Sequence, residues 1–496
     1  MNLFRTKPID ANAVTGLRRV LGPVDLTLMG IGCIIGAGIF VLTGQAAALH
    51  AGPAIVISFG ITGIACAFSA LSYAELASSI GGCGSAYGYG YASLGEIVGW
   101  IIGWDLLLEY GLGVATVAVG WSGYVTDAIK SIGFTIPYGW THAPGVCAPI
   151  QPATNAMLTH PLDTVAQTAQ QCGGVNAPAI IIILLLAVLL AVGVKESARF
   201  NAVMVCVKLL ALLLFIGLAI TKVNPEFWHP FIPPVGPNPL GQTAYGWGGI
   251  MGGAAVIFFA YIGFDSVATA AEETRNPQRN VPIGILTSLI VCTILYMIVS
   301  LLLTGIVPFK TLNVASPVAK AILDVGYNWG AAAVAIGAIA GLSTVMLVLF
   351  FGLTRILLAM SRDGLLPNAA AQVSEKTGTP VRIIYILGFV LAAVAGFTPI
   401  DILATLVNIG TLAAFTVVCV GVIVLRYTKP DMLRPFKTPL TPALPALGAL
   451  INIYIAVHLP GRTWIAFGVW LVIGLCIYFL YSYKHSELHE PANDAA

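Results

Sequence analysis

The stretch Met29-Gly30-Ile31-Gly32-Cys33-Ile34-Ile35-Gly36-Ala37-Gly38-Ile39-Phe40 places four glycines within nine residues of an apolar run. Two of them, Gly32 and Gly36, form a GxxxG pair, which lets two membrane helices approach closely. Taken alone, the stretch is therefore compatible either with a packing seam or with a helix that breaks open in the membrane.

A second stretch, Phe258-Phe259-Ala260-Tyr261-Ile262-Gly263-Phe264-Asp265-Ser266, favours the broken helix. It carries a glycine at the middle of another apolar run, followed two residues later by a carboxylate. A single glycine beside an aspartate makes a poor packing seam, and an aspartate inside a membrane is costly unless it serves a function.

The composition indicates a membrane protein. Of the 496 residues, 58% are hydrophobic and only 9% are charged, whereas a soluble chain carries about 25% charged residues. A span needs about 20 apolar residues, and twelve runs qualify. They are 24–48, 52–78, 97–127, 177–194, 202–221, 247–271, 283–307, 328–360, 381–397, 401–425, 442–459 and 463–483.

The two glycine-interrupted stretches lie in the first and sixth runs, so each opens a group of five. An odd number of spans inverts the second group, and interrupted spans at matching places in two inverted halves indicate a transporter's binding site. We therefore expect an all-α membrane protein with five parts. These are an amino-terminal segment 1–23, a first repeat 24–222, a second repeat 223–425, two further helices within 426–483 and a tail 484–496.

The distribution of Lys and Arg predicts the orientation. Placing both termini on one side puts seventeen of the 23 basic residues there and five on the other side, with Lys208 inside a span. Both termini are thus expected in the cytoplasm, and the long loop 128–176 outside the cell membrane. Cys147 and Cys172 lie in that loop, where an oxidising environment permits a disulfide; two free thiols are the alternative.

The interrupted helices also indicate the ligand. The amino terminus of a new half-helix exposes N–H groups and attracts an anion such as a carboxylate. The carboxyl terminus of the preceding half exposes carbonyl groups, which suit an ammonium. Two crossed breaks would therefore hold a small zwitterion, most simply an α-amino acid. Glycine is expected at Gly36 because a Cβ would crowd the bound carboxylate.

Several motifs resemble the amino acid–polyamine–organocation (APC) superfamily, and within it bacterial members of the cationic amino acid transporter family. The resemblance covers nearly the whole chain, and it implies a LeuT-like fold of five plus five inverted helices with two extra helices, twelve in all. The motifs are GIGCIIGAGIFVLTG at 30–44, GCGSAYGYGYASLGE at 82–96, GVKESARFNAVMVCVKLL at 193–210, FFAYIGFDSVATAAEETRNPQRNVPIGI at 258–285 and AMSRDGLLP at 359–367.

The resemblance also implies roles for individual residues. The backbone N–H groups of Gly36, Ala37 and Gly38 would bind the substrate carboxylate. The α-ammonium would be bound by the carbonyl groups of the residues that precede each break, and Phe259 would close over the substrate as an aromatic gate. These carbonyl groups belong to Ile34, Phe259, Ala260 and Ile262.

Lys208 lies within the apolar run VMVCVKLLALLLFIG of the fifth span. An ammonium there is costly, so this lysine could take up and release a proton during transport, and proton-coupled relatives carry a lysine at this position. The alternative is snorkelling, because Lys208 is only about six residues, or ~9 Å, from the cytoplasmic start of its span.

Three further carboxylates, Glu109, Asp105 and Asp265, lie in the expected spans. Glu109 shares a helix face with Asp105, one turn earlier. It matches a glutamate that lines the side-chain pocket in the family, and it could pair with a cationic substrate or bond to a neighbouring helix. Asp265 could face the same pocket, tether the unwound backbone or act as a second proton-binding group.

Other classes of function fit less well. The sequence has no HExxH, GxSxG or GxxxxGK[ST] motif of an enzyme, no metal-ligand spacing among its cysteines, and a net charge of +2 without a basic cluster for nucleic acid. We expect no cofactor, and proton-coupled symport of L-amino acids by alternating access. An exchanger for cationic amino acids and a membrane sensor that binds an amino acid without moving it remain the alternatives.

Overall fold

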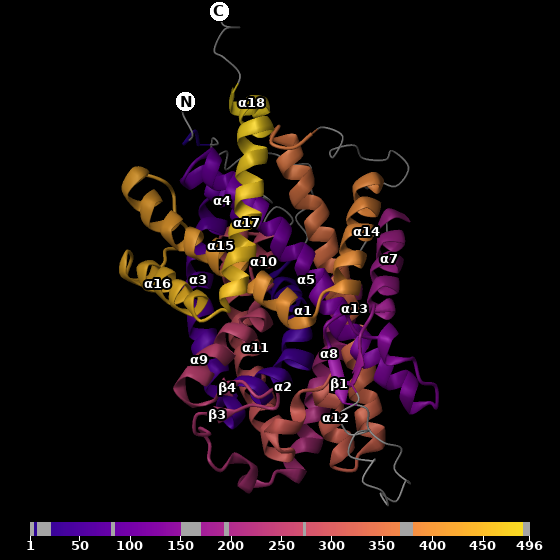
Figure 1. The fold of residues 1–496 in the computed structure, drawn as a ribbon. Helices are drawn as coiled ribbons and strands as arrows, with labels where there is room; N and C mark the ends of the chain where they lie inside the picture. The colour runs from indigo at the N-terminus through magenta and orange to yellow at the C-terminus, as the bar shows by residue number, and fades with distance from the viewer. Residues whose placement is uncertain are drawn as a thin grey trace, which may run out of the picture.

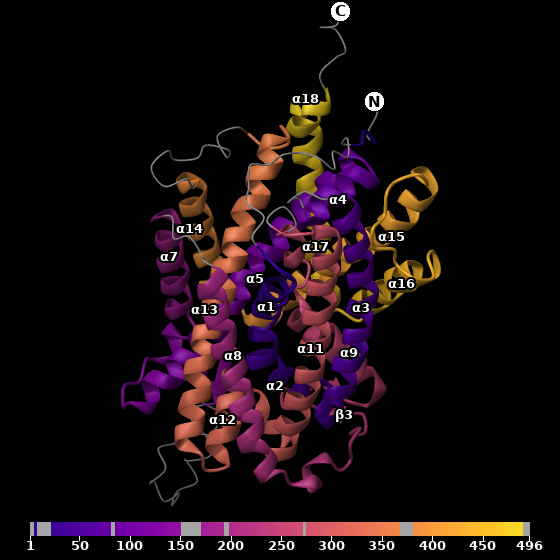
Figure 2. The ribbon, with the colours of Figure 1, turned by 180° about the vertical axis from the view of Figure 1, so that it is seen from behind.

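A computed structural model describes residues 4–6, 21–80, 85–149, 170–192, 198–270, 274–367 and 380–489. Most of the expected amino-terminal segment 1–23, part of the loop 128–176 and the end of the tail 484–496 lie outside these ranges. The described chain is a bundle of helices, most of which run roughly along one direction (Figures 1 and 2).

The long helices of the bundle coincide with the expected apolar runs. They are α3 (Ile55–Ser79), α5 (Glu96–Ser131), α8 (Ala198–Ala219), α11 (Pro277–Ile306), α13 (Asn328–Arg362), α15 (Ile400–Thr428) and α17 (Gly461–Ile477), the last of which is long only with its helical continuation to His485. The shorter apolar helices are α1 (Pro23–Ile34), α7 (Ala177–Val192), α9 (Gly246–Ile257), α14 (Val381–Phe397) and α16 (Ala443–Val457).

Within the described residues, eight helical stretches are long and apolar enough to cross a membrane, and four apolar helices are shorter. The four shorter ones, α1, α7, α14 and α16, each lie in an expected run. The stretch that contains α9 reaches spanning length only when its distorted continuation through Ala268 is included. Length and composition thus establish an all-helical, multi-pass membrane protein.

Short elements connect these helices. The short α-helices are α2 (Thr43–Ala46), α4 (Ser85–Ser93), α10 (Ser266–Thr269), α12 (Pro317–Asp324) and α18 (Tyr483–His485). Single turns are η1 (Gly38–Leu42), η2 (Ala47–Ala51), η3 (Gly52–Ala54), η4 (Tyr138–Trp140), η5 (Ile220–Lys222), η6 (Pro225–Trp228), η7 (Phe258–Tyr261), η9 (Phe309–Leu312), η11 (Tyr478–Ser482) and η12 (Glu487–His489). The Pro/Gly-rich segment 223–246 contains η6 and a small antiparallel pair, β3 (Gly236–Pro237) and β4 (Thr243–Ala244).

Helix α5 lies inside the bundle and packs against both α13 and α15, while α1 packs between α8 and α11. The outward faces of α7 and α17 are apolar and exposed, including Ile181, Leu185 and Ile465. Lipid is the solvent that such faces require, because water would leave this apolar area unburied. The bundle therefore places α1, α5 and α13 where side chains can meet away from lipid.

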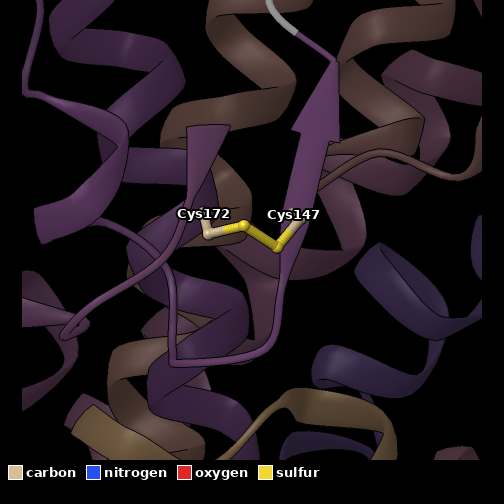
Figure 3. Close-up of a disulfide and its surroundings, with 2 residues drawn as sticks. All are labelled: Cys147 and Cys172. Atoms are coloured by element: carbon tan, nitrogen blue, oxygen red, sulfur yellow. A yellow bond between two sulfur atoms is a disulfide. The ribbon is translucent and has the colours of Figure 1, made fainter. Parts of the chain in front are cut away.

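The long loop after α5 is closed by a disulfide (Figure 3). Strands β1 (Cys147–Pro149) and β2 (Gln170–Cys172) pair antiparallel with Cys147 opposite Cys172, and the two sulfurs are bonded. This hairpin lies at the same end of the bundle as α12 and the β3–β4 pair, and α4 and α18 lie at the opposite end (Figures 1 and 2).

The two ends of the described chain meet at the start of α5. The Arg5 guanidinium donates to the Leu488 carbonyl at 2.6 Å, and the buried Glu96 carboxylate accepts from the hydroxyls of Tyr478 at 3.0 Å and Ser486 at 2.8 Å. The first and last described segments therefore lie on the same side of the bundle, opposite the disulfide hairpin.

Candidate functional site

The first glycine-rich stretch is a broken helix. Helix α1 ends at Ile34, and Ile35 is extended with φ −74° and ψ 98°. A new helical segment then begins with the π-helical turn η1 at Gly38, preceded by Ala37. The first N–H groups of a helix have no partner within it, so the segment from Gly36 to Gly38 presents donors at the interruption.

The second stretch is interrupted in a different way. Helix α9 ends at Ile257, the tighter 3₁₀ turn η7 follows, and Ile262 is extended with φ −61° and ψ 135°. Gly263 has φ +118°, a conformation that residues with a Cβ rarely adopt. The chain becomes helical again only at α10, so the glycine is needed where the direction changes.

The two breaks cross in direct contact. A Cβ on Gly38 would overlap the backbone of Ala260, and a Cβ on Gly263 would lie 2.8 Å from the Cys33 Cβ. At each of these two positions glycine is required because the opposite broken helix passes too close for a Cβ. A Cβ on Gly36, in contrast, would lie 3.4 Å from Val345, which is an ordinary contact. The packing of the protein itself does not demand glycine at position 36.

A small cavity lies at this crossing. It measures about 20 Å³, which is enough for about one water molecule. The cavity brings together most of the residues expected to bind substrate, whereas Ala260 and Asp265 are not part of its lining. The lining residues are Cys33, Ile34, Gly36, Ala37, Gly38, Glu109, Gly113, Val117, Phe259, Ile262, Val345 and Leu349.

Two side chains bind the carbonyl groups at the end of α1. The Lys208 ammonium donates to the Gly32 carbonyl at 2.7 Å, and the Tyr296 hydroxyl donates to the Ile34 carbonyl at 2.8 Å. Lys208 is 1% exposed, so its side chain does not reach the interface as snorkelling would require. A Cβ on Gly341 would lie 2.8 Å from the Lys208 Cγ, which shows that this glycine makes room for the lysine.

Different groups hold the second break. The Asn408 amide of α15 donates to the carbonyls of Ala255 and Val256 at 2.7 and 3.0 Å. One Asp265 carboxylate oxygen accepts from the Gly263 N–H at 3.2 Å, and the other accepts from the Tyr110 hydroxyl at 3.3 Å. Of the roles considered for Asp265, the observed contacts match a tether for the unwound backbone.

Glu109 faces the cavity from α5. It is 2% exposed, and neither carboxylate oxygen has a hydrogen-bond partner among the described residues. The nearby Thr411 hydroxyl donates instead to the Val407 carbonyl at 3.0 Å. A buried acceptor of this kind is costly, so Glu109 is suited to receive a donor or a cation from whatever enters the cavity.

Sequence reasoning did not identify several residues that shape the site. Tyr296 and Asn408 bind the carbonyls of the two breaks, and Val117, Val345 and Leu349 form the apolar wall. A polar side chain within an apolar span is a signal that could have identified Asn408. The valines and the leucine resemble the lipid-facing residues of the same helices, so the sequence carries no comparable signal for them.

Comparisons with known proteins identify the family of the chain. The model of the amino acid permease family matches residues 21–482. A branched-chain amino acid permease of Bacillus subtilis (strain 168) is 46% identical over 495 residues, 99% of each chain. A methylthioribose transporter of the same organism is 44% identical, covering 99% of this chain and 100% of that one. A vacuolar cationic amino acid transporter of Arabidopsis thaliana is 38% identical, covering 87% and 68%.

The family match spans both broken helices and the cavity between them. Full-length similarity to bacterial permeases, together with the apolar helices, places the chain in a membrane with multiple passes and excludes an enzyme. The chain belongs to the amino acid permease family of the APC superfamily and is a membrane transporter.

Proposed function

We propose that the protein takes up L-amino acids across the cell membrane, coupled to protons, by alternating access. The observation that carries the proposal is the crossing of two broken helices over one cavity. The N–H groups from Gly36 to Gly38 bind the carboxylate, and carbonyls at the ends of α1 and η7 bind the α-ammonium. Phe259 covers the bound substrate.

The proposed architecture is a LeuT-like one of twelve membrane helices. Residues 24–222 form the first repeat, 223–425 the inverted second repeat, and 426–483 two additional helices. One broken helix at the start of each repeat supports this division. Both termini lie in the cytoplasm, which the distribution of Lys and Arg supports, and the disulfide hairpin faces outside.

A proton carried by Lys208 supplies the coupling. Protonated Lys208 donates a charge-assisted bond to the Gly32 carbonyl, and such bonds are about twice as strong as neutral ones. Loss of the proton weakens this contact and releases α1 from α8. Because α1 carries one wall of the cavity, the protonation of Lys208 and the opening of the substrate site become linked.

The wall of the cavity supports neutral substrates with apolar side chains. Gly113, Val117, Val345 and Leu349 surround the position that the side chain would take, and one relative is named a branched-chain permease. The cavity is smaller than any amino acid, so α1 and η7 must separate to admit one. Methylthioribose, the substrate in another relative's name, is a second ligand worth testing.

Glu109 supports the second candidate, an exchanger for cationic amino acids. Its unpartnered carboxylate faces the cavity and could pair with the side chain of lysine or arginine. The third candidate is a sensor that binds an amino acid without moving it. It needs the same binding site at the crossing of the two broken helices, here called the cradle, but no release on the opposite side.

One experiment separates these candidates. The purified protein is reconstituted into proteoliposomes, and uptake of labelled amino acids is measured with an inward proton gradient, without a gradient, and against an internal unlabelled pool. Gradient-driven accumulation of neutral amino acids supports the proposal. Uptake that occurs only against an internal pool of lysine or arginine favours the exchanger, and binding without any uptake favours the sensor. Competition by the twenty amino acids and methylthioribose then defines the substrates.

A further inference from the structure

We propose that Tyr296 is a positioning residue for the carbonyl of Ile34, the group that receives the substrate ammonium. The inference rests on the proposed function, because it assigns a role within the same cradle. Tyr296 is fully buried in α11, and its hydroxyl donates to the Ile34 carbonyl at 2.8 Å. Ile34 is the last residue of α1 and lines the cavity.

The position of the Tyr296 ring is set by its neighbours. Its centroid lies 5.6 Å from that of Phe59 and 5.7 Å from that of Tyr261, and all three rings are buried. Aromatic rings packed at such distances interact favourably beyond the area they bury. Packing against α3 and η7 thus fixes the position of the Tyr296 hydroxyl beside the break, whether or not a ligand is bound.

The Ile34 carbonyl needs such a donor. In an unbroken helix it would accept the N–H four residues later, but the chain leaves the helix at Ile35. A buried carbonyl without a donor is costly, and its direction would be poorly fixed. A carbonyl oxygen has two lone pairs. Tyr296 uses one of them and aims the carbonyl, which leaves the other for an ammonium that enters the cavity.

This arrangement is a preorganised acceptor. The cost of ordering the carbonyl is met on folding, so it does not subtract from the affinity for substrate. Removing only the hydroxyl should therefore weaken substrate binding, in addition to the loss of stability from a buried carbonyl without a donor. The expected loss is a rise in KM of about three- to tenfold, which is the range for one net hydrogen bond.

A matched control lies on the other side of the same break. The Tyr124 hydroxyl of α5 donates to the Phe40 carbonyl at 2.7 Å, and both residues are fully buried. Phe40 belongs to η1, after the interruption, and does not line the cavity. Tyr124→Phe thus removes the same chemical group from the same broken helix, away from the carbonyls proposed to bind the ammonium.

The experiment compares wild type, Tyr296→Phe and Tyr124→Phe in proteoliposomes and by thermal unfolding. For Tyr296→Phe we expect KM for the preferred amino acid to rise about three- to tenfold, with the maximal rate within about twofold of wild type. For Tyr124→Phe we expect KM to stay within about twofold. Inhibition by the matching carboxylic acid without an α substituent, which has no donor for the Ile34 carbonyl, should be equal in all three proteins.

A purely structural role for Tyr296 predicts a different pattern. In that case the two variants would change KM alike, or Tyr296→Phe would lower only the maximal rate and the unfolding temperature. Either result overturns the inference, and so does a parallel loss of inhibition by the carboxylic acid without an α substituent. If wild type itself neither binds nor takes up any amino acid, the proposed function fails, and this inference fails with it.

Discussion

The two broken helices differ in what binds their freed carbonyls. At the end of α1, the donors are an ammonium, Lys208, and a phenol, Tyr296. At the end of α9, the donor is the amide of Asn408, and the continuation beyond Gly263 is tied down by Asp265. An amide does not change its charge between pH 5 and 8, whereas a proton can leave an ammonium.

This difference suggests that the two broken helices have different roles in transport. The α9 side is held by contacts that do not depend on a change of protonation, so it suits a fixed wall. The α1 side is held by the Lys208 ammonium, whose contact would depend on a proton under the proposed coupling, so it suits the part that moves. Substitutions that affect one break and spare the other can test this division.

The largest effect is expected at the contact between the breaks, for Gly38→Ala. The added Cβ would overlap the backbone of Ala260, and backbone cannot move aside as a side chain can. Overpacking of this kind costs about 1–3 kcal/mol or more. We therefore expect a clearly lowered unfolding temperature and no measurable uptake, checked by thermal unfolding of purified protein and by proteoliposome uptake.

Gly36→Ala, two residues earlier, is the matched comparison. Its Cβ would meet only Val345 at 3.4 Å, so the unfolding temperature should stay close to that of wild type. Uptake should still be lost, because the methyl group enters the place proposed for the carboxylate. Normal uptake by Gly36→Ala, or by the bulkier Gly36→Leu, would place the carboxylate elsewhere.

The second largest effect concerns Lys208. In Lys208→Ala, no proton can be carried at the end of α1, so an inward proton gradient should no longer drive accumulation. Exchange of labelled for unlabelled amino acid across the vesicle membrane should persist if the cradle itself is intact. The measurement is uptake as a function of the imposed gradient, with and without internal substrate. A variant that accumulates substrate in response to the gradient as wild type does would remove Lys208 from the coupling.

Gly341, which packs against the Lys208 side chain, allows a milder version of the same test. In Gly341→Ala, the new methyl group would lie 2.8 Å from the Lys208 Cγ and push the ammonium away from the Gly32 carbonyl. We expect a reduced response to the gradient, intermediate between wild type and Lys208→Ala, and the same uptake series measures it. Gly337→Ala controls for displacement of α8 alone, since its Cβ would overlap the Ala211 Cβ on the same helix without touching the lysine.

How far the sequence predicts this site depends on the kind of interaction. The breaks themselves were predictable because glycine and a carboxylate inside an apolar run are rare, and their matching places in the chain reinforced each other. The family and the membrane class followed from the same motifs and were confirmed by the comparisons. The expected run 24–48 covers η1 and all but the first residue of α1, and 247–271 covers η7, α10 and all but the first residue of α9.

The partners of the breaks were not predictable in the same way. Which carbonyl receives Lys208, and that Tyr296 and Asn408 reach the two helix ends, depends on how separate helices rotate and pack. An apolar run fixes neither rotation nor packing, because lipid and protein interiors are equally apolar. For the same reason the sequence left three roles open for Asp265, and only the packed structure shows its oxygens accepting from Gly263 and Tyr110.

A moderate effect is expected for the fixed side of the cradle, in Asn408→Ala. Two carbonyls of α9 would lose their donor, which costs about 1–3 kcal/mol for buried acceptors. The unfolding temperature should fall and KM should rise, but the remaining uptake should respond to the proton gradient as wild type does. That combination distinguishes the two breaks. If Asn408→Ala abolished the gradient response while keeping uptake, the proton would act on both sides.

The smallest effect is expected for Glu109→Gln. The amide keeps the size of the side chain, and no described group donates to the carboxylate that it replaces. If neutral amino acids are the substrates, their KM should change by no more than about threefold, because the apolar wall of Val117, Val345 and Leu349 is unaltered. If lysine or arginine is carried, the loss of a buried charge partner should raise its KM by tenfold or more, as breaking such pairs costs about 3–5 kcal/mol. Measuring both classes of substrate in one variant therefore shows whether the site selects the substrate side chain by its charge or only by its shape. The two breaks bind the α-amino acid part that all these substrates share, so selection by charge would depend on Glu109.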